Sequence, residues 1–248
     1  MTHPCILLAL SIVAIFACVA CNSSPGRPGP GSEVIPPDQI VDFSILYGQN
    51  CAGCHGAGGN GGAAIALRDP VFLAIGDDLA IRKATSNGVR GTAMPAFAQS
   101  AGGMLTDKQI DAIVSGIRSW AQSGSLRGAN PPPYEAKTPG NAQHGAEVYQ
   151  TFCSSCHGPD GTRGKSASSI VDASYLALVS DQYLRTTVIA GRPELGAPDW
   201  RENVPSRPMS DQEVTDVVAW LTSRRAPSPG QPYPETKNMQ HQERHDVD

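Results

Sequence analysis

A pentapeptide of the form Cys-x-x-Cys-His occurs twice in this 248-residue chain. Residues 51–55 read CAGCH, and residues 153–157, about 100 positions further along, read CSSCH. In both copies a Gly follows the His and a Tyr precedes the first Cys by four positions. Because the pattern recurs together with its flanking residues, we interpret the chain as two copies of one unit.

The repeat continues to the end of each unit, where residues 105–117 read LTDKQIDAIVSGI and residues 209–221 read MSDQEVTDVVAWL. Apolar residues recur there with helical periodicity, Thr106 or Ser210 can cap the helix, and an Asp follows in the first turn. We predict two closing helices, a shorter helix before each Cys pair, and a short helix near 78–86 and 181–188. No alternating strand pattern occurs, so the predicted fold class is all-α with long loops.

Proline, glycine and serine mark the boundaries of the units. Residues 22–37 and 124–140 are rich in them, which predicts a flexible linker and a Pro-rich linker. The predicted organisation is a signal peptide over 1–21, a linker over 22–37, a first domain over 38–123, a Pro-rich linker over 124–140, a second domain over 141–225 and a disordered tail over 226–248.

The amino-acid composition limits the classes of function that fit the chain. The chain has 19 Lys and Arg against 23 Asp and Glu, a net charge of −4, which argues against nucleic acid as a partner because phosphate binding needs a surplus of cations. Only 6% of the residues are aromatic. Two domains near 85 residues each would have thin cores, so each needs additional stabilisation.

The Cys-x-x-Cys-His pattern is the attachment signature of c-type haem. Two thiols at this spacing can add to the two vinyl groups of one haem, and the adjacent His then reaches the iron as its proximal ligand. A zinc site would need both Cys pairs together, yet they belong to separate repeats. A thioredoxin-like redox pair would need a βαβ setting that the sequence lacks. We therefore predict covalent haem attachment at Cys51, Cys54, Cys153 and Cys156, with His55 and His157 as iron ligands.

With these motifs, about 170 of the 248 residues resemble the class I cytochrome c family, as two tandem cytochrome c domains. The resemblance implies a helix before each haem motif, a closing helix packed across it, and two covalently bound haem c groups. It also implies a distal Met ligand from the loop before the closing helix. In the first repeat that position is Met94, which is followed by Pro95; Met104 is a competing candidate next to the closing helix.

The second repeat departs from the family pattern at the distal ligand. When Gly191 is aligned with Gly88, Ala197 occupies the position of Met94, and alanine cannot bind iron. Met209 is the nearest Met, but it aligns with Leu105. Three outcomes are open: the loop refolds so that Met209 binds the iron, the second haem is five-coordinate or water-ligated, or another residue such as His144 binds it.

The N-terminus carries an uncharged apolar run from Ile6 to Ala20, sized like the core of a signal peptide. The run resembles a bacterial lipoprotein signal, in which a Cys after small residues receives the lipid. Cys21, with Cys18 as the other register, is the expected anchor; a plain cleaved signal is the alternative. We expect an exported bacterial protein, periplasmic or held on the outer membrane face by its lipid.

The expected function is electron transfer by a di-haem carrier rather than enzymatic catalysis. Expected partners are a quinol-oxidising complex, a terminal oxidase or a periplasmic dehydrogenase. The alternative is a di-haem peroxidase or a small-ligand-binding haem enzyme that uses an open second haem beside Ala197.

Overall fold

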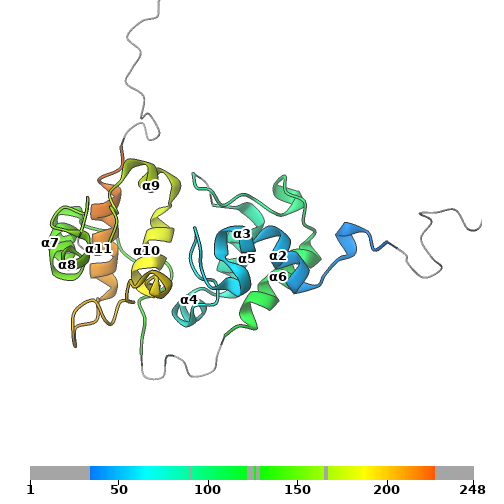
Figure 1. The fold of residues 1–248 in the computed structure, drawn as a ribbon, viewed down its shortest axis with the longest axis horizontal. Coiled ribbons are helices and arrows are strands. Elements are labelled where there is room, and N and C mark those ends of the chain that lie inside the picture. Colours follow the sequence, from blue (N-terminus) through cyan, green and yellow to red (C-terminus); the bar gives the residue numbers. More distant parts are fainter. Residues whose placement is uncertain (1–33, 90, 122–125, 127–128, 165–166, 227–248) are drawn as a thin grey trace, which may run out of the picture. The chain divides into compact units, whose positions relative to one another are not determined.

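The structure is a computed structural model that describes residues 34–89, 91–121, 126, 129–164 and 167–226 (Figure 1). The predicted signal peptide, Cys18 and Cys21, most of the 22–37 linker and nearly all of the tail lie outside these residues. The chain divides into two compact units, Met1–Gln39 and Ile40–Asp248. Of the first unit, the described part contains the 3-10 turn η2 (Pro37–Gln39). Both repeats belong to the second unit.

The two repeats contain the same helices in the same order. The first has α2 (Phe43–Asn50), α3 (Ala52–His55), α4 (Pro70–Ile75), α5 (Asp78–Asn87) and α6 (Asp107–Arg118), with 3-10 turns η3 (Ala57–Gly59) and η4 (Gln99–Ala101). The second has α7 (Ala142–Phe152), α8 (Ser154–His157), α9 (Ala173–Leu178), α10 (Asp181–Ala190) and α11 (Asp211–Thr222), with the turn η5 (Pro193–Leu195). Within the described residues no strand forms, which confirms the all-α prediction.

The predicted helix starts are confirmed. Thr106 caps α6 and Ser210 caps α11, each in a capping box with the residue at the third helical position. The sequence prediction missed α4 and α9. Each has six residues, too few to show a helical period, and each is capped by an Asp carboxylate, that of Asp69 or Asp172.

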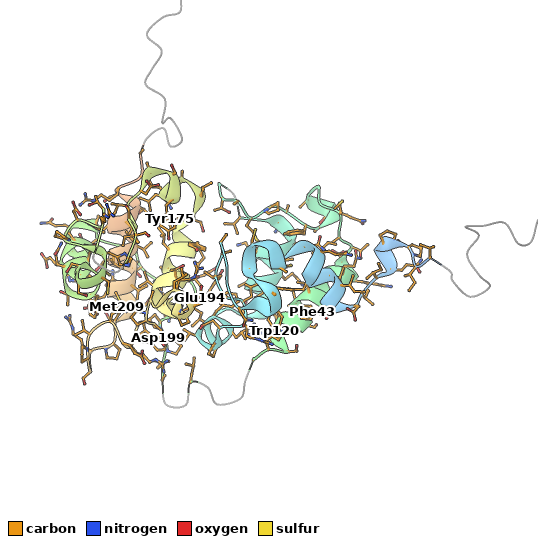
Figure 2. The ribbon with its side chains drawn as sticks, viewed as in Figure 1. Phe43, Trp120, Tyr175, Glu194, Asp199 and Met209 are labelled. Carbon is orange, nitrogen blue, oxygen red and sulfur yellow. The ribbon has the colours of Figure 1, made fainter. Side chains whose placement is uncertain are left out.

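In both repeats the helix before the Cys pair packs on the closing helix, α2 on α6 and α7 on α11, and the helix before the distal loop packs on the same closing helix (Figure 1). Buried apolar residues of the closing helices, such as Ile113 and Val217, form the core at these contacts. Aromatic rings pack beside these contacts: the ring centroid of Trp120 lies 5.1 Å from that of Phe43 (Figure 2) and 5.1 Å from that of Tyr47. In the second repeat Tyr149 stacks on Trp220 with ring centroids 4.2 Å apart.

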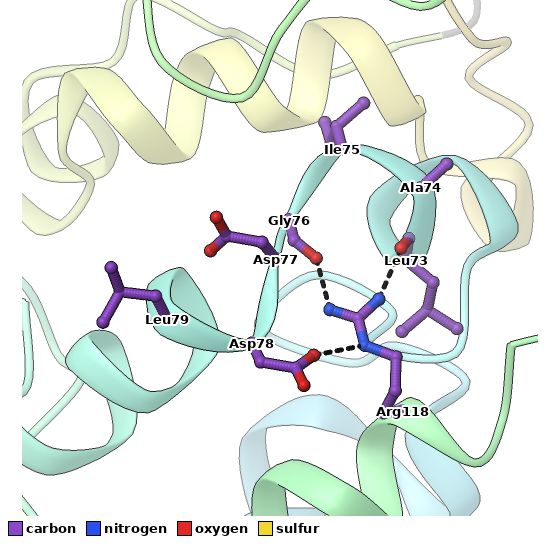
Figure 3. Close-up of a pocket in the computed structure, with 8 residues that line it drawn as sticks. All are labelled: Leu73, Ala74, Ile75, Gly76, Asp77, Asp78, Leu79 and Arg118. Atoms are coloured by element: carbon purple, nitrogen blue, oxygen red, sulfur yellow. Dashed lines mark hydrogen bonds and ion pairs between the residues drawn. The ribbon is translucent and has the colours of Figure 1, made fainter.

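An arginine near the end of each closing helix binds the junction between two earlier helices, α4 and α5 in the first repeat and α9 and α10 in the second. Arg118 donates to the carbonyls of Leu73 and Gly76 at 2.6 and 2.5 Å and to the Asp78 carboxylate at 2.7 Å, across a hollow of about 530 Å³ (Figure 3). In the second repeat Arg225 makes the same three bonds with the equivalent residues Leu176, Val179 and Asp181. The Arg118 guanidinium thus makes its hydrogen bonds with residues that line this hollow. We therefore interpret the hollow as part of the packing between helices.

The segment predicted as the Pro-rich linker makes specific contacts at its C-terminal end. Arg185, 3% exposed, donates to the carbonyls of Pro133 and Tyr134 at 2.8 and 3.0 Å, and Gln182 donates to Tyr134 at 2.7 Å. Gln212 bonds Thr138 and the carbonyl of Pro139. Residues 133–139 are therefore bound to α10 and α11. No helix in the described part of the chain has the length and apolar character needed to cross a membrane.

Candidate haem sites

Each Cys-x-x-Cys-His pattern forms the end of one helix and a single helical turn after it. Cys51 ends α2 and starts α3, and Cys153 does the same between α7 and α8. The turn stops at Gly56 or Gly158, with φ of 78° or 81°. Tyr47 and Tyr149 then donate their hydroxyls to the carbonyls of these two glycines, at 2.9 and 2.5 Å. This arrangement brings both thiols and the His of each pattern onto one turn.

The histidines are held alike. Nδ1 of His55 lies 2.9 Å from the carbonyl of Ile65, and Nδ1 of His157 lies 3.1 Å from the carbonyl of Ser168. A carbonyl can only accept, so Nδ1 carries a proton, and in the neutral imidazole Nε2 keeps its lone pair. A fixed ring with a free Nε2 is what an axial ligand requires. The residues therefore fit a haem iron, and these carbonyls are parts of the site that the sequence motifs did not reveal.

The protonation states of His55, Cys51 and Cys153 favour the same use. Burial lowers the pKa of His55, opposed by the bond to Ile65 and assisted by the charge of Arg192, so the neutral imidazole prevails at neutral pH. Burial and the neighbouring Cys54 raise the pKa of Cys51 to about 11, and burial and Cys156 raise that of Cys153 to about 12. These thiols are protonated, unlike the thiolates of redox-active pairs.

The four cysteines form no disulfide, and among the described residues no group of three or more His, Cys, Asp or Glu is placed to hold a metal ion.

The distal loops of the two repeats share one backbone hydrogen bond at equivalent positions. The amide of Val89 donates to the carbonyl of Met94 at 3.0 Å, and that of Arg192 donates to the carbonyl of Ala197 at 2.9 Å. The structure thus places Met94 and Ala197 at equivalent positions, as the sequence alignment does. Met94 is half-buried, whereas the competing Met104 is 82% exposed.

The other two candidate ligands of the second iron, Met209 and His144, lie outside the distal loop of residues 192–200. Met209 is 3% exposed and occupies the position of Leu105 in the core, just before α11 (Figure 2). His144 is half-exposed, and its Nδ1 lies 2.7 Å from the Asp216 carboxylate, between α7 and α11. The sequence did not suggest this pair, because 72 residues separate its members.

Two tandem helical domains, each with a Cys-x-x-Cys-His turn and an oriented His, define a di-haem c-type cytochrome. The family model of cytochrome c oxidase, cbb3-type, subunit III, matches residues 38–115 and 140–221, and the chain belongs to this family. It accordingly binds two covalent haem c groups and acts in electron transfer.

Curated relatives bear related names. The chain is 31% identical to the cbb3-type cytochrome c oxidase subunit CcoP of Azospirillum sp. over 212 residues, 76% of this chain and 65% of the relative. It is 31% identical to subunit FixP of Sinorhizobium medicae over 160 residues, 58% of this chain and 50% of the relative. The chain thus spans about half to two thirds of these proteins. Among solved structures, a chain of the reducing HAO-like protein complex of Kuenenia stuttgartiensis matches with a TM-score of 0.43 and 18% identity, covering 78% of this chain and all of that one.

Proposed function

We propose that this chain is a one-electron carrier that delivers electrons to a terminal oxidase of the cbb3 type. The family match and the names of the CcoP and FixP relatives support this partner. A quinol-oxidising complex or a periplasmic dehydrogenase would supply the electrons. The observation that carries the proposal is that both His side chains are held through Nδ1 by a backbone carbonyl, leaving Nε2 for iron.

Each residue has a defined part. Cys51 and Cys54 attach the first haem, and Cys153 and Cys156 attach the second. His55 and His157 are the proximal ligands, and in the first domain Met94 is the distal one. The bound haem supplies a one-electron couple between ferric and ferrous iron, whose potential the axial ligands and burial adjust.

We propose further that the chain works outside the cytoplasm, anchored to a membrane by a lipid on Cys21 or Cys18. Metabolic labelling with a radioactive fatty acid tests the anchor. Label should persist in Cys18→Ser and disappear in Cys21→Ser if Cys21 carries the lipid. Label in neither wild-type nor variant protein would overturn the anchor and leave the haem sites unaffected.

The function is tested on the full chain purified from detergent-solubilised membranes of its own bacterium. A pyridine haemochrome assay should give two haems per chain, and one in a Cys51→Ser/Cys54→Ser variant. Oxygen consumption by membranes fed with an artificial one-electron donor should fall when the chain is deleted and recover on complementation. Unchanged oxygen consumption would overturn the oxidase partner, and a haem count other than two would overturn the sites.

A further inference from the structure

Residues 192–200, the distal loop of the second domain, contain no side chain that binds haem iron, although two backbone contacts of this loop match those of the first. Gly88 and Gly191 have φ of 66° and 72°, and a Cβ added at either would lie 2.7 Å from the carbonyl of Met94 or Ala197. Only Gly allows this approach. This close approach and the hydrogen bonds from the Val89 and Arg192 amides align Met94 with Ala197. The Ala197 methyl group therefore stands where the Met94 side chain begins.

Met209 is held in a different place. Its amide donates to the carbonyl of Trp200 at 2.9 Å, as the amide of Leu105 donates to that of Phe97 at 2.8 Å. The capping box of Ser210 follows at once, so the backbone of Met209 is fixed on both sides. Its side chain is 3% exposed in the core, against 6% for Leu105. Met209 fills an apolar position that a Leu fills in the first domain.

The remaining polar groups of the loop are already used. The Glu194 carboxylate accepts from Nε of Arg192 at 2.5 Å, and the Asp199 carboxylate accepts from Arg201 at 2.5 Å. Arg192 also donates to the carbonyl of Gly62 at 2.6 Å. Residues 192–200 contain no His, Met, Lys or Cys, so no side chain there has a nitrogen or sulfur atom suited to bind haem iron. These contacts hold the loop without a bond to iron.

We propose that the iron of the second haem has an open distal coordination position that takes small diatomic π-acceptor ligands, the class of carbon monoxide and nitric oxide. The proposal rests on the proposed attachment of that haem by Cys153, Cys156 and His157. Ligand class follows from the site: ferrous haem binds such molecules wherever no strong distal ligand competes. The first haem, with Met94 available, would be closed to them.

Titration of the reduced, full-length protein with carbon monoxide tests this, after the haem count has been confirmed as two. Wild-type protein should bind one carbon monoxide per two haems. The Ala197→Met variant recreates the Met-Pro pair of residues 94 and 95 and should bind none. Met94→Ala should bind two, and Met209→Leu, the matched control, should bind one. Electron paramagnetic resonance of the ferric proteins should show one high-spin haem in wild type and none in Ala197→Met.

Two low-spin haems and no carbon monoxide bound in wild type would overturn the proposal while leaving the haem sites intact. If Met209→Leu then opened one site, Met209 would be identified as the distal ligand. A haem count other than two would instead be a failure of the proposed function. Near-infrared absorption gives an independent readout, since only a sulfur ligand produces the sulfur-to-iron charge-transfer band: one such haem is expected in wild type and two in Ala197→Met.

Discussion

The ring of Phe43 in α2 lies directly on Gly116 in α6, where an added Cβ would overlap the ring. In the second domain the large and the small residue have changed helices: Gly145 in α7, at the position of Phe43, faces Asp216 and Trp220 in α11, and Trp220 is at the position of Gly116. Each crossing of the haem-bearing and closing helices is thus filled by one aromatic residue and one glycine. The pairing of an aromatic residue with a glycine is retained although the two residues have exchanged helices.

This relationship predicts that Gly116→Ala destabilises the first domain. Forcing a methyl group into a packed crossing costs about 1–3 kcal/mol, more than the roughly 0.5–1 kcal/mol that Ala contributes over Gly in a helix. Gly48, in α2 with no atom within 4 Å of its Cβ position, is the matched control: Gly48→Ala should stabilise. The free energy of unfolding from denaturant titration of the haem-loaded protein checks both. Equal effects of the two variants would contradict the packing argument.

The hydrogen bonds of Arg118, which Arg225 repeats in the second domain, give the second prediction, on the free energy of unfolding. Each arginine binds two carbonyls at the end of α4 or α9 and the Asp that begins α5 or α10, so removal of either side chain leaves those acceptors without their donor. We expect Arg118→Ala to lower the free energy of unfolding by about 1–2 kcal/mol, since both guanidinium groups are partly exposed. Arg82, whose ion pair with Asp111 lies on the surface, is the control, with an expected loss below about 0.5 kcal/mol. Similar losses in both variants would show that the carbonyl contacts add little.

The two arginines also show where sequence reasoning stops. The alignment that pairs Thr106 with Ser210 pairs Arg118 with Thr222, so it gives no hint that Arg225, three residues further on, takes over the same three acceptors. The helices with a clear period and a capping residue were predicted correctly, because local sequence determines them. The carbonyls that orient His55 and His157 were not predictable, since they depend on how the following loop folds back. Similarly, the composition of residues 124–140 does not indicate that this segment binds a buried arginine of α10.

Arg185 is that arginine, and it yields a third prediction. Its guanidinium is 3% exposed and is shared among Pro133, Tyr134, Thr215 and Asp211. Arg185→Met keeps much of the side-chain volume but removes the donor from the buried Thr215 and from three partly buried acceptors, which should cost about 2–3 kcal/mol. It should also free the segment around residue 134 for limited proteolysis. Gln182→Ala, which removes one weaker contact with Tyr134, is the control. Arg185→Met with wild-type stability and cleavage rate would show that the segment is held by other contacts.

The pair of His144 and Asp216 gives the fourth prediction, a dependence of stability on pH. The hydrogen bond to Asp216 raises the pKa of His144 above its usual 6.5, helped by the charges of Asp216, Glu147 and Glu213 and opposed by desolvation. Burial alone would raise the pKa of Asp216, but hydrogen bonds from Asn141, His144 and Gln212 lower it below its usual 3.8. Asp216 is 2% exposed, so the pair ties α7 to α11 at a buried carboxylate.

The directions of the two pKa shifts define the pH range in which the pair stabilises the fold. Stability from the raised pKa of His144 is fully present below pH 6.5 and is lost as pH rises through the higher, folded value. Stability from the lowered pKa of Asp216 is present above pH 3.8 and is lost as pH falls through the lower, folded value. The difference in unfolding free energy between wild type and His144→Gln should therefore be greatest between about pH 4 and 6.5 and shrink on either side. Glu147→Gln, which removes a distant charge and no bond, should show a much weaker trend; a His144→Gln difference that stays constant from pH 4 to 9 would mean that the pair does not titrate with folding.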